Sequence, residues 1–288
     1  MRRIKITVSI LTACAAVFAV GAVGASAALP ELGRCLKVEA VKEGKKLVYH
    51  GAFKGATCQK ADSNHRGRYE FYPGPGAKNH FYGLATEPEP VFETVGGSKV
   101  SCGEVVFKGE YTGAKTEKVT IGLGGCEEGA SGSAKYCQSN PAKEGEIEGL
   151  QTLEGELGTI KGGIKPVVGW ALKSSGPLFT FTCGKLPEVS SEQTIEGSII
   201  GTLSKGFFGN DLNKMSLGAT IKYVAKRGIQ SPQAFEGATP DLLTTTKLVG
   251  LTQTKEQTGL DTTEETESGT GESHENPEVE EPLEVKTK

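Results

Sequence analysis

Hydrophobic and polar residues alternate along much of the chain between residues 35 and 252. In Leu178-Phe179-Thr180-Phe181-Thr182-Cys183 the two phenylalanines fall on one face of an extended segment and the two threonines on the other. Ala219-Thr220-Ile221-Lys222-Tyr223 alternates in the same way. A period of two, with β-branched and aromatic residues, is typical of half-buried strands. The chain after the N-terminal segment contains no convincing amphipathic helix of three turns.

Glycine separates these short runs, and the chain contains 40 glycines. Gly96-Gly97, between two apolar runs, predicts a tight hairpin, and Tyr72-Pro73-Gly74-Pro75-Gly76 predicts a pair of turns. Many short strands and frequent turns predict an all-β fold, either a β-sandwich or an irregular antiparallel β-barrel. We expect one globular domain over residues 28–260. The expected strands are residues 35–40, 46–50, 68–72, 91–95, 99–102, 104–111, 118–123, 166–172, 178–183, 194–203, 219–225 and 247–252.

The N-terminal segment has the features of a secretory signal peptide. Arg2, Arg3 and Lys5 precede an uncharged run, and Ala25-Ser26-Ala27 offers a small-x-small cleavage pattern. We therefore expect Sec-type export with cleavage near Ala27, which places the protein outside the cell or in the envelope. An uncleaved membrane anchor is one alternative, because the apolar run is long enough to span a bilayer. Lipidation at Cys14, after Leu11-Thr12-Ala13, is a minor second one.

The cysteines agree with export. Apart from Cys14, there are six, an even number that predicts a disulfide framework in an oxidising compartment. Six cysteines allow fifteen pairings, and the sequence alone does not decide among them. Local spacing suggests that Cys35 pairs with Cys58 and Cys126 with Cys137, which leaves Cys102 and Cys183 as a long-range pair.

Acidic residues are concentrated at the C-terminus. Residues 28–288 contain 29 Lys and Arg against 35 Asp and Glu, and residues 261–288 alone contain ten acidic residues and two lysines. This balance argues against nucleic acid as a partner. The Thr- and Glu-rich composition from about residue 253 predicts a disordered acidic tail. Leu283-Glu284-Val285 is a candidate final strand within it.

Several short motifs together resemble a group of uncharacterised exported actinobacterial proteins, many copies of which occur per genome. The resemblance covers residues 30 to about 259 and supports export and a single globular unit. Because the group has no established activity, it implies no site residues. The motifs are Pro30-Glu31-Leu32-Gly33-Arg34-Cys35, Tyr72-Pro73-Gly74-Pro75-Gly76, Phe92-Glu93-Thr94-Val95-Gly96-Gly97, Gly109-Glu110-Tyr111-Thr112-Gly113, Leu153-Glu154-Gly155-Glu156-Leu157-Gly158, Phe181-Thr182-Cys183-Gly184, Asn213-Lys214-Met215 and Phe235-Glu236-Gly237.

No catalytic, cofactor or metal site is predicted. The pairs Glu154/Glu156 and Glu146/Glu148 would each share a strand face, but neighbouring glycines indicate open, solvated surface rather than the apolar pocket that raises a carboxyl pKa. The four histidines suggest no third metal ligand. Aromatic residues near Arg66 form the most distinctive local feature. Most of them fit a core, and Phe81, Tyr82 and Arg66 are weak candidates for a binding surface.

These observations favour an exported, non-enzymatic protein, either a binding module or a structural component of the envelope or surface. Its expected partner is an extracellular ligand, a glycan or a protein, with membrane contact only through the signal segment. A secreted polysaccharide-acting hydrolase that uses paired glutamates is one alternative. An inhibitor or toxin-like module with an exposed loop between Cys126 and Cys137 is another.

Overall fold

The computed structural model describes residues 30–129, 134–140, 142–149, 151–184, 190–206, 212–268 and 282–287. In these ranges the regular elements are β-strands, and the long-range pairings among them are antiparallel. The prediction of an all-β fold is therefore confirmed, and of the two predicted architectures the chain adopts the barrel. Nothing in these ranges forms a helix with the length and apolar character needed to cross a membrane. The predicted signal segment, including Cys14, lies outside the described residues.

Eight antiparallel strands form a closed barrel. In spatial order β18 pairs with β17, followed by β14, β13, β9, β8, β5 and β22, and β22 returns to pair with β18. The strands are β5 (His80–Ala85), β8 (Glu104–Tyr111), β9 (Thr116–Gly124), β13 (Leu153–Lys161), β14 (Val167–Lys173), β17 (Ser198–Gly206), β18 (Gly218–Tyr223) and β22 (Thr252–Ser268).

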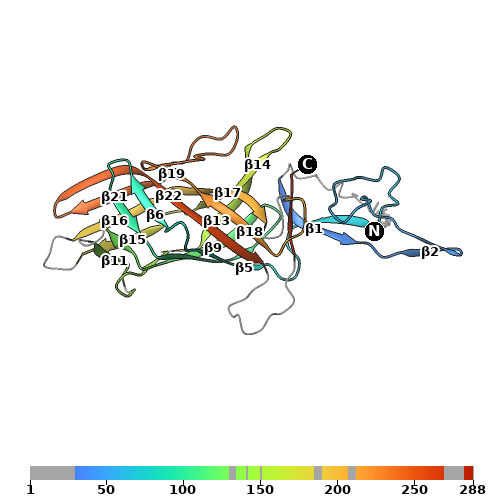
Figure 1. The fold of residues 1–288 in the computed structure, drawn as a ribbon, viewed down its shortest axis with the longest axis horizontal. Helices are drawn as coiled ribbons and strands as arrows, with labels where there is room; N and C mark the ends of the chain where they lie inside the picture. The colour runs from blue at the N-terminus through green and yellow to red at the C-terminus, as the bar shows by residue number, and fades with distance from the viewer. Residues whose placement is uncertain are drawn as a thin grey trace, which may run out of the picture.

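Shorter strands extend the wall beyond one end of this barrel. They form a second ring of paired strands that begins and ends at β22, through β21 on one side and β6 on the other. Residues 252–261 of β22 pair with β21 and β6, whereas residues 262–268 pair with β18 and β5. The long β22 therefore runs through both parts of the elongated body (Figure 1). The additional strands are β6 (Val91–Thr94), β7 (Lys99–Ser101), β10 (Glu127–Glu128), β11 (Lys135–Gln138), β15 (Phe179–Cys183), β16 (Ser191–Glu196) and β21 (Thr244–Val249), and β12 (Ile147–Glu148) pairs with β9.

Alternation in the sequence determines which side chains face inward. On β15, Phe179, Phe181 and Cys183 are buried, and the two threonines between them face outward, as predicted. The Gly96-Gly97 hairpin is also confirmed, because it joins β6 to β7. Gly97 has a φ of 84°, a conformation that glycine adopts without steric cost.

A small three-stranded sheet covers the other end of the barrel. Its central strand β1 (Glu31–Lys37) lies between β4 (Tyr69–Pro73) and β23 (Glu284–Lys286). Leu32 and Leu283 are buried in the same core as the barrel residues. The Leu32 N–H donates to the Ala114 carbonyl (2.7 Å), and the Ser216 N–H donates to the Leu283 carbonyl (2.7 Å). These contacts fix the sheet to the barrel.

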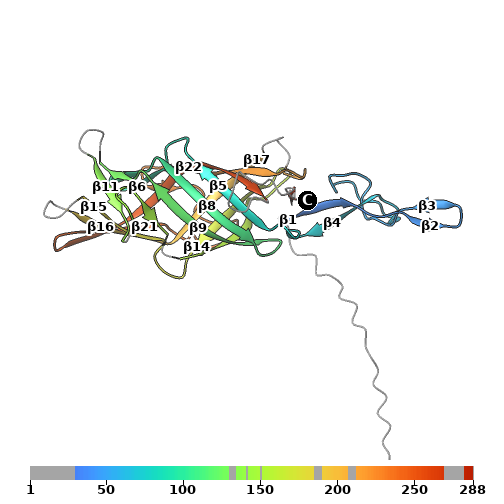
Figure 2. The same ribbon diagram turned by 90° about the horizontal axis from the view of Figure 1, so that it is seen from below.

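Residues 36–68 project away from this sheet as an extended arm (Figure 2). The arm includes the hairpin of β2 (Val41–Glu43) and β3 (Lys46–Val48). A second small hairpin, β19 (Ala225–Lys226) with β20 (Ile229–Gln230), packs on β22 instead.

Two of the three predicted disulfide pairings are wrong. Cys35 pairs with Cys58 as expected, but Cys102 pairs with Cys126 and Cys137 with Cys183. Cys137 and Cys183 are direct cross-strand partners on β11 and β15. This pairing follows from the register of two strands that are distant in sequence, and not from the spacing of the cysteines along the chain.

The prediction of a disordered tail from residue 253 is also wrong for its first part. Residues 252–268 form β22, and the suggested final strand exists as β23. Residues 269–281 lie outside the described residues. The composition was misleading because the inward face of β22 is itself polar: Thr258, Thr262 and Glu264 are buried there with Leu260.

Removal of the Cys137–Cys183 bridge by the double substitution Cys137→Ala, Cys183→Ala is expected to lower the free energy of unfolding by about 2–4 kcal/mol, because the bridge restricts the unfolded chain. Denaturant titration of both proteins measures this loss. Peptide mapping without reduction provides the connectivity check. A peptide that links Cys102 to Cys183 would contradict the assignment.

Candidate functional site

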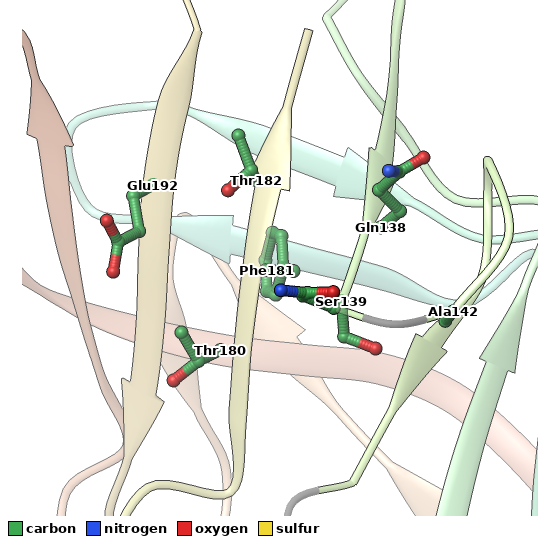
Figure 3. Close-up of a pocket in the computed structure, with 8 residues that line it drawn as sticks. Gln138, Ser139, Ala142, Thr180, Phe181, Thr182 and Glu192 are labelled. Atoms are coloured by element: carbon green, nitrogen blue, oxygen red, sulfur yellow. The ribbon is translucent and has the colours of Figure 1, made fainter. Parts of the chain in front are cut away.

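A groove on the outer wall, near the end of the body opposite the arm, gathers polar side chains from three neighbouring strands (Figure 3). Its volume is about 410 Å³. Among the described residues it is lined by Gln138, Ser139, Asn140, Ala142, Thr180, Phe181, Thr182 and Glu192. The Phe181 ring is buried toward the core, so the accessible chemistry of the groove consists of hydroxyls, amides and one carboxylate.

Strand register aligns the groove's central residues. Gln138 on β11 pairs with Thr182 on β15, which in turn pairs with Glu192 on β16. Side chains at directly paired positions on one face lie about 5 Å apart. Thr180 forms the next row with Thr194, and their hydroxyl oxygens are 3.5 Å apart. The rows offer regularly spaced donors and acceptors.

An exposed aromatic side chain borders these rows. Tyr136 precedes Gln138 by two residues on β11, so both side chains point outward from the same face. The Tyr136 residue is 51% exposed. An aromatic ring beside hydroxyl and amide groups is an arrangement that binds sugars, whose faces stack on the ring while their hydroxyls form hydrogen bonds.

A second polar cluster lies inside the barrel and is buried. Tyr111 on β8 is the cross-strand partner of Glu117 on β9, and both side chains point inward. The Tyr223 hydroxyl donates to Oε2 of Glu264 at 2.8 Å. Aromatic rings surround the cluster: Phe107 stacks on Tyr223, and Trp170 and Phe81 contact Tyr111.

Burial changes the proton affinity of these carboxyls. It raises the pKa of Glu264 to about 8, against a smaller lowering by the Tyr223 hydrogen bond. Burial, followed by repulsion from Glu264, raises the pKa of Glu117 well above its ordinary value. Glu264 is thus mainly protonated at neutral pH. The cluster holds protons in a closed core, which gives the fold a pH-dependent stability.

Glycine makes room for one of the two carboxyls. Gly155 on β13 pairs with Glu117, and a Cβ at this position would collide with the Glu117 side chain. The strict alternation of Glu117, Val119, Ile121 and Leu123 already places this glutamate on an apolar face. The alternation is a signal in the sequence from which the buried position of Glu117 can be predicted. Glu264 has no such alternation of apolar residues around it, because its neighbours are threonines and glutamates. For this reason its segment was predicted to be disordered.

A third cluster surrounds Glu128 on β10. Its carboxylate accepts hydrogen bonds from Ser191 Oγ and Gln193 Nε2, both at 2.9 Å, and pairs with the Lys247 ammonium. Ser191 and Gln193 are buried. These polar groups satisfy one another, so the cluster links β10 to β16 and β21, two strands with which β10 does not pair in the sheet.

The glutamate pairs proposed for a hydrolase lie on open surface. Glu154 and Glu156 are both exposed on the outer face of β13, and Glu156 pairs with Lys173 at 3.6 Å. In the other pair, Glu148 is exposed and Glu146 is half-buried. Cys126 and Cys137 bond to different partners, so no bridge between them closes the loop expected for an inhibitor.

The three weak surface candidates do not come together. Phe81 is buried inside the barrel against Tyr111, contrary to the expectation that it lies at the surface. Alternation on β5 places Tyr82 on the outer wall, where it is half-buried. Arg66 is exposed on the arm.

Cys35, Cys58 and Glu284 place potential metal ligands within 4.8 Å of one another, but the two sulfurs are joined in a disulfide. This removes both thiolates as ligands.

Comparison of the chain with protein-family models, curated proteins and solved structures finds no match.

The substitution Glu264→Gln is expected to stabilise the protein between pH 7 and 8 by about 1–3 kcal/mol, because the folded carboxyl keeps a proton that the unfolded one releases. The contribution of Glu264 to the stability of the wild type should fall as pH rises from about 4.5 to about 8 and then level off. Chemical denaturation at several pH values measures both effects.

Glu154→Gln, at an exposed position of the same barrel, is the matched control and should leave the pH profile unchanged. Equal slopes for the wild type and Glu264→Gln would show that Glu264 does not titrate in this range.

Proposed function

We propose that the chain is an exported, non-enzymatic binding protein whose outer groove takes a neutral, hydroxyl-rich ligand, namely a glycan. The observation that carries the proposal is the aligned row Gln138–Thr182–Glu192 with Tyr136 beside it. The row supplies amide, hydroxyl and carboxylate partners for sugar hydroxyls, and Tyr136 supplies a stacking surface. Among the described residues that line the groove none is cationic, which favours a neutral ligand over an anionic one.

Export is supported from two directions. Three disulfides are typical of proteins that fold in an oxidising, extracytoplasmic compartment. The N-terminal sequence has the charge and apolar pattern of a signal peptide. The resemblance to exported actinobacterial proteins agrees with this compartment, and we propose that the chain belongs to that group.

The hydrolase alternative has less support. Retaining or inverting glycoside hydrolysis requires two carboxylates that face the same substrate across a site. Glu154 and Glu156 lie on the outer barrel wall, whereas Glu117 and Glu264 are enclosed in the core. In the described part of the groove, Glu192 is the one carboxylate in the lining. The groove therefore favours binding over cleavage.

A glycan screen with the chain from Ala28, followed by calorimetric titration, tests the binding proposal. Tyr136→Ala and Gln138→Ala are each expected to weaken binding about tenfold or more, since stacking and hydrogen bonding both act on the ligand. Tyr72→Ala is the matched control, because Tyr72 is a similarly exposed tyrosine, 43% accessible, on the end sheet. Affinity that survives both groove substitutions would place the ligand elsewhere.

The intact mass of the native protein without reduction, measured separately in culture medium and envelope, tests export. We expect the mass of residues 28–288 less the six hydrogens lost in three disulfides. A heavier, acylated species that begins at Cys14 would instead assign the protein to the membrane through a lipid anchor.

A further inference from the structure

The arm, residues 36–68, carries a strong positive charge at its surface. Its exposed carboxylates are Glu39 and Glu43. Against these two stand eight exposed cationic side chains: Lys37, Lys42, Lys45, Lys46, Lys54, Lys60, Arg66 and Arg68. Glu43 is itself within 3.1 Å of a ring nitrogen of His50. The arm therefore differs from the chain as a whole, whose net charge is −3.

The tip of the arm combines these charges with exposed apolar side chains. In the β2–β3 hairpin, Leu47 is 69% exposed and Val41 is 52% exposed. Lys42 is the direct cross-strand partner of Leu47, and Lys45 and Lys46 lie at the turn. The hairpin occupies one extreme of the molecule in both views (Figures 1 and 2). Exposed apolar residues next to lysines are a combination typical of interaction surfaces.

The base of the arm is held in place by several independent contacts. The Cys35–Cys58 disulfide joins it to β1. Lys286 on β23 lies over the rings of Phe53 and Phe71, at 3.7 and 4.6 Å from their centres. The same ammonium donates a hydrogen bond to the Cys58 carbonyl at 3.0 Å. These contacts fix the base of the arm to the end sheet.

We propose that the arm docks the protein on an anionic lipid surface, with the β2–β3 hairpin as the leading contact. A soluble polyanion or an acidic peptide segment would neutralise the lysines but would provide little apolar surface against which Leu47 and Val41 are buried. A lipid interface accepts both kinds of side chain, because headgroup phosphates attract the lysines and the acyl boundary receives the apolar groups. This contact would be additional to any made by the signal segment.

Docking through the arm would leave the groove accessible. The groove is formed by β11, β15 and β16, which lie at the opposite end of the body from β2 (Figure 1). A protein seated on its arm therefore presents the groove away from the surface. The arm proposal does not rest on the glycan proposal, since the two involve different residues and different assays.

Sedimentation with vesicles tests this proposal, using the chain from Ala28, which contains every described element. We expect binding to vesicles of phosphatidylcholine with 30% phosphatidylglycerol and little binding to phosphatidylcholine alone. The triple variant Lys42→Glu, Lys45→Glu, Lys46→Glu should lower the partition coefficient by about tenfold or more, since each lysine contributes near a charged surface. Leu47→Ser should lower it by a few-fold while leaving all charges in place.

The matched control reverses three exposed lysines on the barrel wall, Lys108→Glu, Lys118→Glu and Lys222→Glu, and should bind as the wild type does. Circular dichroism shows whether each variant folds. Equal losses in the arm and barrel variants would show that net charge alone acts, which overturns the proposal. Binding to polyglutamate without binding to vesicles would assign the arm to an acidic protein partner instead.

Discussion

The hydrogen bonding of β22 on both of its edges is the constraint on which the rest of the structure depends. A sheet has two free edges, and a barrel removes them only if one strand pairs with both. β22 does this twice along its length, first between β21 and β6 and then between β18 and β5. The end sheet, the groove and the arm all take their positions from a wall that this strand closes.

Closure through β22 also explains the unusual interior. A strand with few large apolar residues must face the core, so its inward threonines and Glu264 require internal partners. Thr258 bonds to Thr245 at 2.6 Å, Thr262 to the Pro88 carbonyl at 3.1 Å, and Glu264 to Tyr223. A buried ionised carboxylate is very costly, and protonation of Glu264 avoids much of that cost.

Local patterns in the sequence predict the strands well but not the closure. Alternation identifies β15, β18 and β9 because each buries one apolar face and exposes one polar face. β22 cannot be recognised by alternation, because several of its inward residues are polar and are accommodated in the core by hydrogen bonds. The cysteine pairs and the row of Gln138, Thr182 and Glu192 depend on register between segments distant in sequence, which no local pattern contains. The basic arm is visible in composition, but its separation from the barrel is not.

The order of the strands along the chain has a consequence for biogenesis. The strand that completes the wall ends at residue 268, and β23, which pairs with the first strand β1, follows at residues 284–286. During synthesis from the N-terminus, both rings of paired strands lack the strand that joins their edges until residues 252–268 are available. The wall therefore closes late in synthesis, after the other barrel strands have been made, and the end sheet is completed later still by β23.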